Sequence, residues 1–171
     1  GLLFALGFIF GYLILQKIFK KEGVPIKVLD DLATYMIIFT IVGARLGHCL
    51  FYEPGYYLSH PLDILKIWEG GLASHGAAIG ILIGIYFFAK RYHKHFLWVM
   101  DRIAIVVALA GFLIRMGNLM NSEIFGDATT LPWGFIFVQN FGEGYTIANH
   151  PTQIYEALAY LGLFVFLYRY Y

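Results

Sequence analysis

Apolar residues gather in five long runs, which are separated by shorter polar stretches. The runs cover residues 1–15, 32–51, 71–89, 103–120 and 154–168. A helix needs roughly 20 residues to cross the hydrocarbon core of a bilayer, and in that core only a helix or a closed barrel satisfies its backbone. We therefore predict an all-α fold, a polytopic transmembrane helical bundle with five spans in this sequence.

Composition supports a membrane protein. Of the 171 residues, 60% are hydrophobic and 13% charged, with a mean hydropathy of +0.69, whereas soluble domains carry about 25% charged residues. We expect residues 1–171 to form a single integral membrane domain. A net charge of +1 gives no basic face for nucleic acid. Both ends lie in apolar runs, so we expect a fragment of a longer protein that lacks both its ends.

Small residues recur at helical spacing within two of the runs. Gly43 and Gly47 lie four residues apart in the second run, and Gly76, Gly80 and Gly84 follow the same spacing in the third. Ladders of this kind let membrane helices approach closely. We interpret these glycines as packing positions.

Basic residues predict the orientation in the membrane. The segment 52–70 contains a single lysine, Lys66, and no arginine. Residues 121–153 contain neither lysine nor arginine, whereas the other connections are basic. Because cytoplasmic loops are enriched in such residues, we expect both of these segments to be extracytoplasmic. The basic residues of the other connections are Lys17, Lys20, Lys21, Lys27, Lys90, Arg91, Lys94 and Arg169, with Arg102 at the start of the fourth run.

The connection 121–153 is long for a loop and contains varied residue types. Loops of this length are usually functional or disordered. Its stretch "WGFIFVQN" is typical of one short strand, and the surrounding Gly, Asn, Asp and Thr residues are typical of turns. We expect a small ordered cap on the extracytoplasmic side.

Charged residues inside the apolar runs point to a polar cavity. Arg45, His75, Arg115 and Glu156 lie on four different runs, each near the end that we place outside. Because intramembrane charges are costly and usually functional, we expect them to line a water-accessible site. Arg115, Asn118 and Ser122 have the i, i+3, i+7 spacing of one helical face.

These side chains favour an anionic ligand near the outer leaflet. A guanidinium offers planar, paired donors to phosphate. The imidazole of His75 is suited to proton transfer near neutral pH, although a lone histidine in a helix is more often structural. Asn118 and Asn121 can hold hydroxyls or phosphate oxygens, and Glu123 can orient Arg115. We expect no metal or other cofactor, because His48, His75 and His150 lack the spacing of a ligand set.

Four polar blocks together resemble one family. "GARLGHCLFY", "GGLASHGAAIG", "RMGNLMNSEIFG" and "HPTQIYE" occur in the order seen in prolipoprotein diacylglyceryl transferases. The resemblance implies a transferase of the bacterial inner membrane with seven spans, whose active site faces the extracytoplasmic leaflet. Such an enzyme catalyses the first step of lipoprotein maturation. It moves diacylglyceryl from phosphatidylglycerol to the lipobox cysteine thiol beside a prelipoprotein signal peptide, and releases glycerol phosphate.

The resemblance also assigns roles to residues. It implies that His75 is the base or proton relay, and that phosphatidylglycerol binding and catalysis involve Arg115, Asn118, Glu123 and Gly126. Its remaining matches, interpreted as substrate-binding positions, are Arg45, His150, Gln153, Tyr155 and Glu156.

A different functional class is also consistent with two intramembrane arginines. A transporter or channel for an anionic solute could use Arg45 and Arg115 as its binding site. Transporters often have internal repeats and a site near the membrane midplane. We find no repeat, and the polar residues lie toward one side, so we favour the enzyme.

Overall fold

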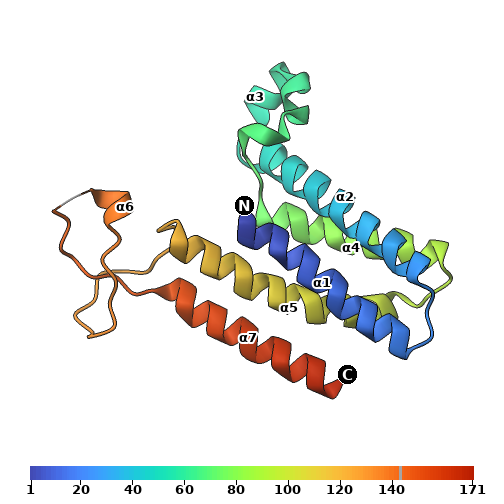
Figure 1. The fold of residues 1–171 in the computed structure, drawn as a ribbon. Coiled ribbons are helices and arrows are strands. Elements are labelled where there is room, and N and C mark those ends of the chain that lie inside the picture. The colour runs from blue at the N-terminus through green and yellow to red at the C-terminus, as the bar shows by residue number, and fades with distance from the viewer. Residues whose placement is uncertain (143) are drawn as a thin grey trace. The chain divides into compact units, whose positions relative to one another are not determined.

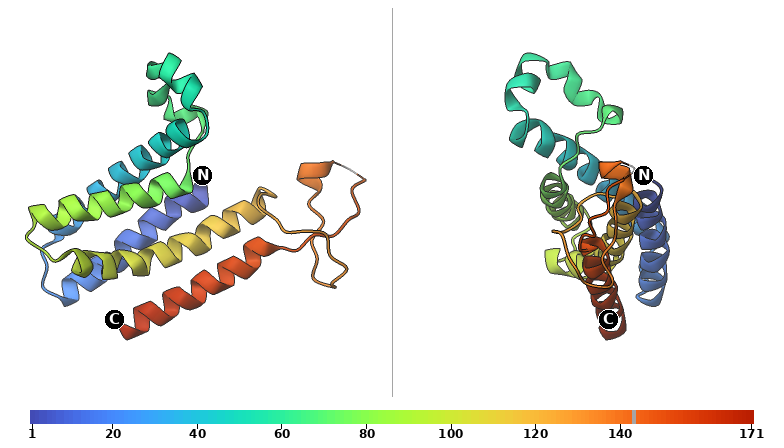
Figure 2. Two further views of the ribbon diagram at one scale, coloured as in Figure 1. Left: turned by 180° about the vertical axis from the view of Figure 1, so that it is seen from behind. Right: turned by 90° about the vertical axis from the view of Figure 1, so that its left-hand side faces the viewer.

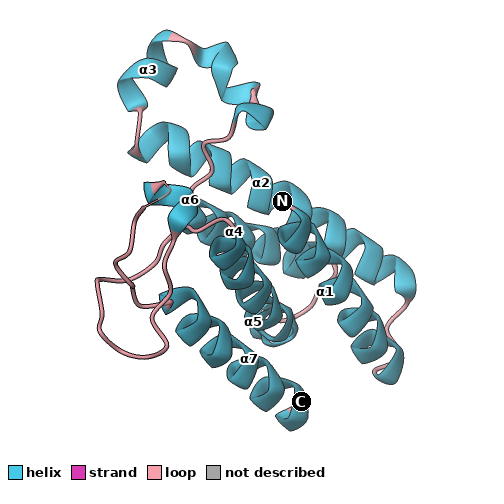
Figure 3. Cartoon of the chain, turned by 60° about the vertical axis from the view of Figure 1, so that its left-hand side comes forward, coloured by secondary structure: helices cyan, strands magenta, loops and turns pink. Residues whose placement is uncertain are grey.

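The computed structural model describes residues 1–142 and 144–171, and within them every regular element is a helix (Figures 1 and 3). Contacts divide the chain into two compact units, one of residues 1–18 with 102–171 and one of residues 19–101. The principal helices are α1 (Leu2–Lys21), α2 (Ile26–Phe51), α4 (Ser74–Arg91), α5 (Phe96–Met120) and α7 (Thr152–Tyr170). The shorter ones are α3 (Pro54–Ser59), η1 (Pro61–Leu65), η2 (Ile67–Glu69) and α6 (Val138–Phe141).

The five apolar runs each form one long helix, as predicted. All five helices begin or end outside the predicted runs, because the flanking residues continue the helical hydrogen bonds. Because every regular element described is a helix, the all-helical fold is confirmed. Within the described part of the chain, α1 and α5 are long and apolar enough to cross a membrane by length and composition.

In the unit of residues 19–101, α2 and α4 lie side by side (Figure 2). Their glycines form the contact. A Cβ added to Gly43 would lie 2.5 Å from the Gly76 carbonyl oxygen, and one added to Gly80 only 2.0 Å from that of Phe39. Any side chain would separate the two backbones. The packing role predicted for these glycines is confirmed.

In the other unit, α5 contacts both α1 and α7. Added Cβ atoms at Gly7 and Gly11 would each lie 3.4 Å from Cβ atoms of α5, those of Ala110 and Val106. On the α7 side, Gly111 faces the Tyr160 ring, whose nearest atom would lie 2.9 Å from such a Cβ. Small residues on α5 thus position the helix that ends at Met120.

The strand predicted for "WGFIFVQN" is wrong. The described residues of this loop form two isolated bridges, Ala128 with Asn149 and Phe135 with Asn149, and then the short helix α6. The Phe125 ring packs against those of Phe137 and Phe141. An aromatic cluster replaces strand pairing as the source of local order.

Candidate functional site

An ion pair joins α5 to α7. The Arg115 Nε lies 2.7 Å from Oε2 of Glu156, and the two side chains are 24% and 42% exposed. The Arg115 Nη1 also donates to Asn118 Oδ1 at 3.4 Å, which confirms that these two residues share a helical face. A guanidinium carries five N–H donors, so three have no partner among the described residues.

Glu123 connects the amides of the same motif. Its Oε2 accepts from Asn118 Nδ2 at 3.0 Å, and its Oε1 accepts from Asn121 Nδ2 at 3.4 Å. Arg115, Asn118 and Glu123 therefore form a chain of polar contacts. This arrangement fixes the amides with their remaining polar atoms available to a ligand.

The turn that returns Glu123 toward α5 is a Schellman motif. The Glu123 N–H donates to the Asn118 carbonyl at 2.8 Å, and the Ser122 N–H donates to that of Leu119 at 3.1 Å. Ser122 occupies the left-handed position with φ 55°, where glycine is usual. Ile124, a β-branched residue, also has φ 55°. The polar face predicted for Arg115, Asn118 and Ser122 therefore ends at Asn118. Ser122 lies beyond the helix, and its hydroxyl donates to Gln139.

The start of α7 holds this turn in place. Gln153 is completely buried and donates from Nε2 to the Glu123 carbonyl at 2.6 Å, and Thr152 donates to the Ile124 carbonyl at 3.0 Å. The other amide atom of Gln153, Oε1, is buried without a hydrogen-bond partner in the described structure. Such an acceptor calls for a donor, either a bound water or a ligand hydroxyl.

Three further predicted residues lie close by within the same unit. Tyr155 accepts from Trp133 Nε1 at 2.9 Å and lies 3.1 Å from His150 Nδ1. The tautomer of His150 sets which of the two groups donates in this hydrogen bond. The backbone of Gly126 lies so close to the start of α7 that a Cβ added there would lie 2.7 Å from a side-chain carbon of Thr152 and 2.9 Å from the Cβ of His150. These contacts give the three residues a role in holding the loop against α7.

Beside the ion pair, α7 bears a shallow groove of about 220 Å³. It is lined by Glu156, Ala159, Tyr160 and Leu163. One end is therefore charged and the other apolar. This combination fits an amphiphile whose polar part lies near Glu156.

Arg45, predicted to bind substrate, contacts the backbone of its own chain. It is 4% exposed, and its guanidinium donates to four backbone carbonyls, those of Asp63 (2.6 Å), Gly70 (2.7 Å), Ile64 (2.9 Å) and Gly71 (3.3 Å). The Tyr57 ring lies below it at 5.1 Å. Its donors face the protein's own backbone, and substrate binding by Arg45 stays an untested prediction.

His75 is exposed near the start of α4. Its ring packs against Phe51 at 5.5 Å and Tyr52 at 5.7 Å, both at the end of α2. No described residue forms a hydrogen bond to its imidazole, so both nitrogens are accessible for proton transfer. His75 and Arg45 belong to one unit and Arg115 and Glu156 to the other.

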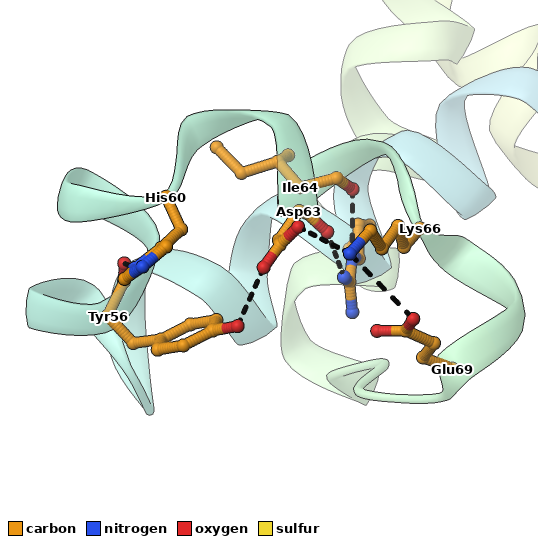
Figure 4. Close-up of polar contacts among 7 residues, drawn as sticks. Tyr56, His60, Asp63, Ile64, Lys66 and Glu69 are labelled. Carbon is orange, nitrogen blue, oxygen red and sulfur yellow. Dashed lines mark hydrogen bonds and ion pairs between the residues drawn. The ribbon is translucent and has the colours of Figure 1, made fainter.

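The segment between α2 and α4 carries a polar cluster that the sequence analysis missed (Figure 4). Asp63 accepts from Lys66 Nζ at 2.7 Å and from the Tyr56 hydroxyl at 2.6 Å. These two donors hold the pKa of the Asp63 carboxyl below its ordinary value, with the Lys66 hydrogen bond as the larger cause. The i, i+3 spacing of Asp63 and Lys66 was the available signal.

Other contributors had no recognisable pattern. Trp133 bonds Tyr155, Gln139 bonds Ser122, and Thr152 bonds Ile124 next to Glu123. They come from a loop or a helix start where no periodicity applies. Only the folded loop brings them to the site.

These features define a class: an all-helical protein, rich in apolar helices, with a paired arginine in a polar network at the end of one of them. Comparison with known proteins then identifies the family. A family model described as "Prolipoprotein diacylglyceryl transferase" matches residues 1–171. The chain belongs to the prolipoprotein diacylglyceryl transferase family.

Individual relatives agree with this family. Phosphatidylglycerol–prolipoprotein diacylglyceryl transferase of Tolumonas auensis is 53% identical over 98% of this chain and 64% of its own length. The proteins of the same name from Porphyromonas gingivalis and Chloroherpeton thalassium are 51% and 46% identical, over 96% and 98% of the chain. The chain spans 60% and 61% of those two relatives.

Proposed function

We propose that the full-length protein transfers the diacylglyceryl group of phosphatidylglycerol to the cysteine thiol of a prelipoprotein. Family membership over residues 1–171 supports this. The single observation that carries it to the residues is the polar network in which Glu156 and Asn118 hold Arg115 and Glu123 holds Asn118. Nothing in the described structure specifically favours an anion transporter.

In the proposed mechanism, the headgroup phosphate binds the donors of Arg115 that have no partner among the described residues. Asn118 and Asn121 hold phosphate oxygens or headgroup hydroxyls, as their amides are aligned by Glu123. A ligand hydroxyl is one candidate donor for the buried Gln153 Oε1. The groove along α7 accommodates an apolar part of the lipid.

The chemical step is an alkyl transfer. His75 takes the proton of the thiol, because the thiolate is the nucleophile. The sulfur then attacks the glyceryl carbon that is bonded to the phosphate oxygen, a new C–S bond forms, and the C–O bond breaks. The electron pair leaves with glycerol phosphate, whose charge Arg115 stabilises. No metal or redox cofactor enters this step.

The same proposal includes the membrane arrangement. The five long helices serve as spans in a bacterial inner membrane, and residues 121–153 form a cap outside it. The lipobox cysteine beside the signal peptide and the headgroup of the lipid meet at the extracytoplasmic leaflet. Support comes from the basic residues of the other connections and from the apolar character of α1 and α5.

Thiol labelling tests this orientation. In a Cys49→Ala background, we expect Thr130→Cys to react with a membrane-impermeant maleimide applied to intact spheroplasts. His93→Cys, in the connection between α4 and α5, should react only after permeabilisation. The reverse pattern contradicts the orientation.

Variants of the full-length protein test the assigned roles in a transfer assay with a lipobox peptide. Arg115→Lys keeps the charge but loses the planar fork, and we expect transfer to fall about 10- to 100-fold, the size of lost charged hydrogen bonds. His75→Gln should lower kcat because the base is removed. Full activity of Arg115→Lys would exclude paired phosphate binding, and full activity of His75→Gln would assign the base elsewhere.

A further inference from the structure

Arg45 is a buried cation whose bonding is directed at its own chain. All three guanidinium nitrogens donate to backbone carbonyls, at 2.6–3.3 Å. No carboxylate of the described residues forms an ion pair with it. An anion-binding arginine presents its planar fork to the ligand. Here four carbonyl dipoles occupy the fork instead.

The carbonyls come from one short segment. Asp63 and Ile64 lie in η1, and Gly70 and Gly71 form the backbone turn that leads to α4. Arg45 therefore ties both ends of residues 63–71 to α2. Figure 4 shows Asp63 and Ile64 among the polar contacts of this segment, with Lys66 and Glu69 beside them.

Steric contacts seal the same arrangement. Gly71 has φ 69°, and a Cβ there would lie 2.6 Å from the His48 ring and 2.9 Å from Arg45 Nη1. The next bond along the chain, from the Ala73 N–H to the Ala44 carbonyl, is 2.9 Å long. This bond fixes the start of α4 against Ala44, the residue that precedes Arg45 on α2.

The segment ends close to His75. The histidine is the second residue of α4, and its ring rests on Phe51 and Tyr52 at the end of α2. A change in the path of residues 70–73 would move the start of α4 relative to those rings. The position of the imidazole thus depends on the carbonyls that Arg45 holds.

We propose that Arg45 is a positioning residue, which orders residues 63–71 and so fixes the start of α4 and the imidazole of His75, and which does not touch the lipid substrate. This inference rests on the proposed transferase function only where activity is concerned. The order of the segment is a separate property of the chain and is measured separately.

Two measurements on the full-length protein in detergent micelles test the proposal. Hydrogen exchange of the amides in residues 63–73 reports the order of the segment. Steady-state transfer to a lipobox peptide reports kcat and the KM for phosphatidylglycerol. The variants are Arg45→Gln, Arg45→Lys and Gly71→Ala, with Gly55→Ala as matched control, because a Cβ at Gly55 has open space around it.

We expect exchange in Arg45→Gln to quicken by roughly tenfold or more, as expected for loss of several hydrogen bonds to a charge. Its kcat should fall while its KM for phosphatidylglycerol stays within twofold. Arg45→Lys should not restore either quantity, since an ammonium cannot reach carbonyls on three sides. Gly71→Ala should reproduce the Arg45→Gln changes, and the double variant should be no worse than either single variant.

Other results overturn the proposal. A raised KM with unchanged kcat and unchanged exchange would make Arg45 a lipid ligand. Unchanged kinetics and exchange in Arg45→Gln would show that the four bonds are dispensable. If the wild-type protein transfers no lipid, the proposed function fails, while the exchange arm still decides whether Arg45 orders the segment.

Discussion

Arg115 on α5 and Glu156 on α7 form an ion pair with a 2.7 Å contact between Nε and Oε2. The pairing uses the inner edge of the guanidinium, next to its side-chain stem. Its terminal nitrogens extend toward Asn118, where only one weak bond of 3.4 Å is made. Glu156 thus orients a cation without occupying all its donors.

Glu156 variants should separate orientation from charge. Glu156→Gln retains an acceptor for Nε, so we expect kcat to change by less than about fivefold. Complete loss of a hydrogen bond to a charged group would change it by more. Glu156→Ala removes the acceptor, and kcat should fall about 10- to 100-fold. Kinetics at saturating phosphatidylglycerol make the comparison. Equal activity of Glu156→Ala and wild type would show that the ion pair has no role in orientation.

The left-handed Ser122 provides a stability test of the turn. Ser122→Gly and Ser122→Ala both lose the hydroxyl bond to Gln139. Only glycine relieves the left-handed strain of about 1–2 kcal/mol, which exceeds its entropic cost, so Ser122→Gly should be more stable than Ser122→Ala by about 0.5–1 kcal/mol. Ser122→Ala keeps the strain, so it should destabilise the protein by about 0.5–1 kcal/mol. Thermal unfolding in one detergent measures both. Equal stability of the two variants would contradict the strained turn.

Close packing of α2 on α4 makes Gly80 sensitive to any side chain. A Cβ there would lie 2.0 Å from the Phe39 carbonyl oxygen, and backbone atoms cannot give way. We expect Gly80→Ala to destabilise the protein by about 1–3 kcal/mol. Gly162→Ala on α7 is the control, because its Cβ meets open space and the substitution favours helix. In thermal unfolding, the midpoint temperature should fall for Gly80→Ala and not for Gly162→Ala.

Order in the segment between α2 and α4 should depend on pH at the acidic end. The folded-state pKa of Asp63 lies below its unfolded value, so its contribution to stability is present above the unfolded value and is lost as pH falls through the folded value. Amide exchange of residues 56–66, corrected for intrinsic rates, should be flat from about pH 5 to 8 and should quicken below about pH 4. Asp63→Asn should abolish that acid-induced change. A wild-type change centred near neutral pH would identify another group.

Helical periodicity and small-residue spacing predicted much of this fold. The apolar runs became helices, and the glycines predicted as packing positions lie in the contact between α2 and α4. Arg115 and Asn118 were also placed on one face correctly, because three residues of one helix separate them. Predictions succeeded where a single periodic element determines the geometry.

Contacts that depend on irregular backbone could not be predicted in the same way. Ser122 breaks the expected face because a serine adopts the conformation usual for glycine. The four carbonyls that meet Arg45 carry no residue type, so no motif could announce them. In the loop, stacked Phe125 and Phe137 replace the strand that β-branched and aromatic residues had indicated.

The reaction itself is the most direct test. Full-length protein is incubated with phosphatidylglycerol and a lipobox peptide, and the peptide mass and released glycerol phosphate are measured together. The account predicts that each peptide gains one diacylglyceryl group as one glycerol phosphate is released, and that Arg115→Lys lowers both equally. An unchanged peptide mass, or anion uptake into proteoliposomes without any lipidated product, would contradict it.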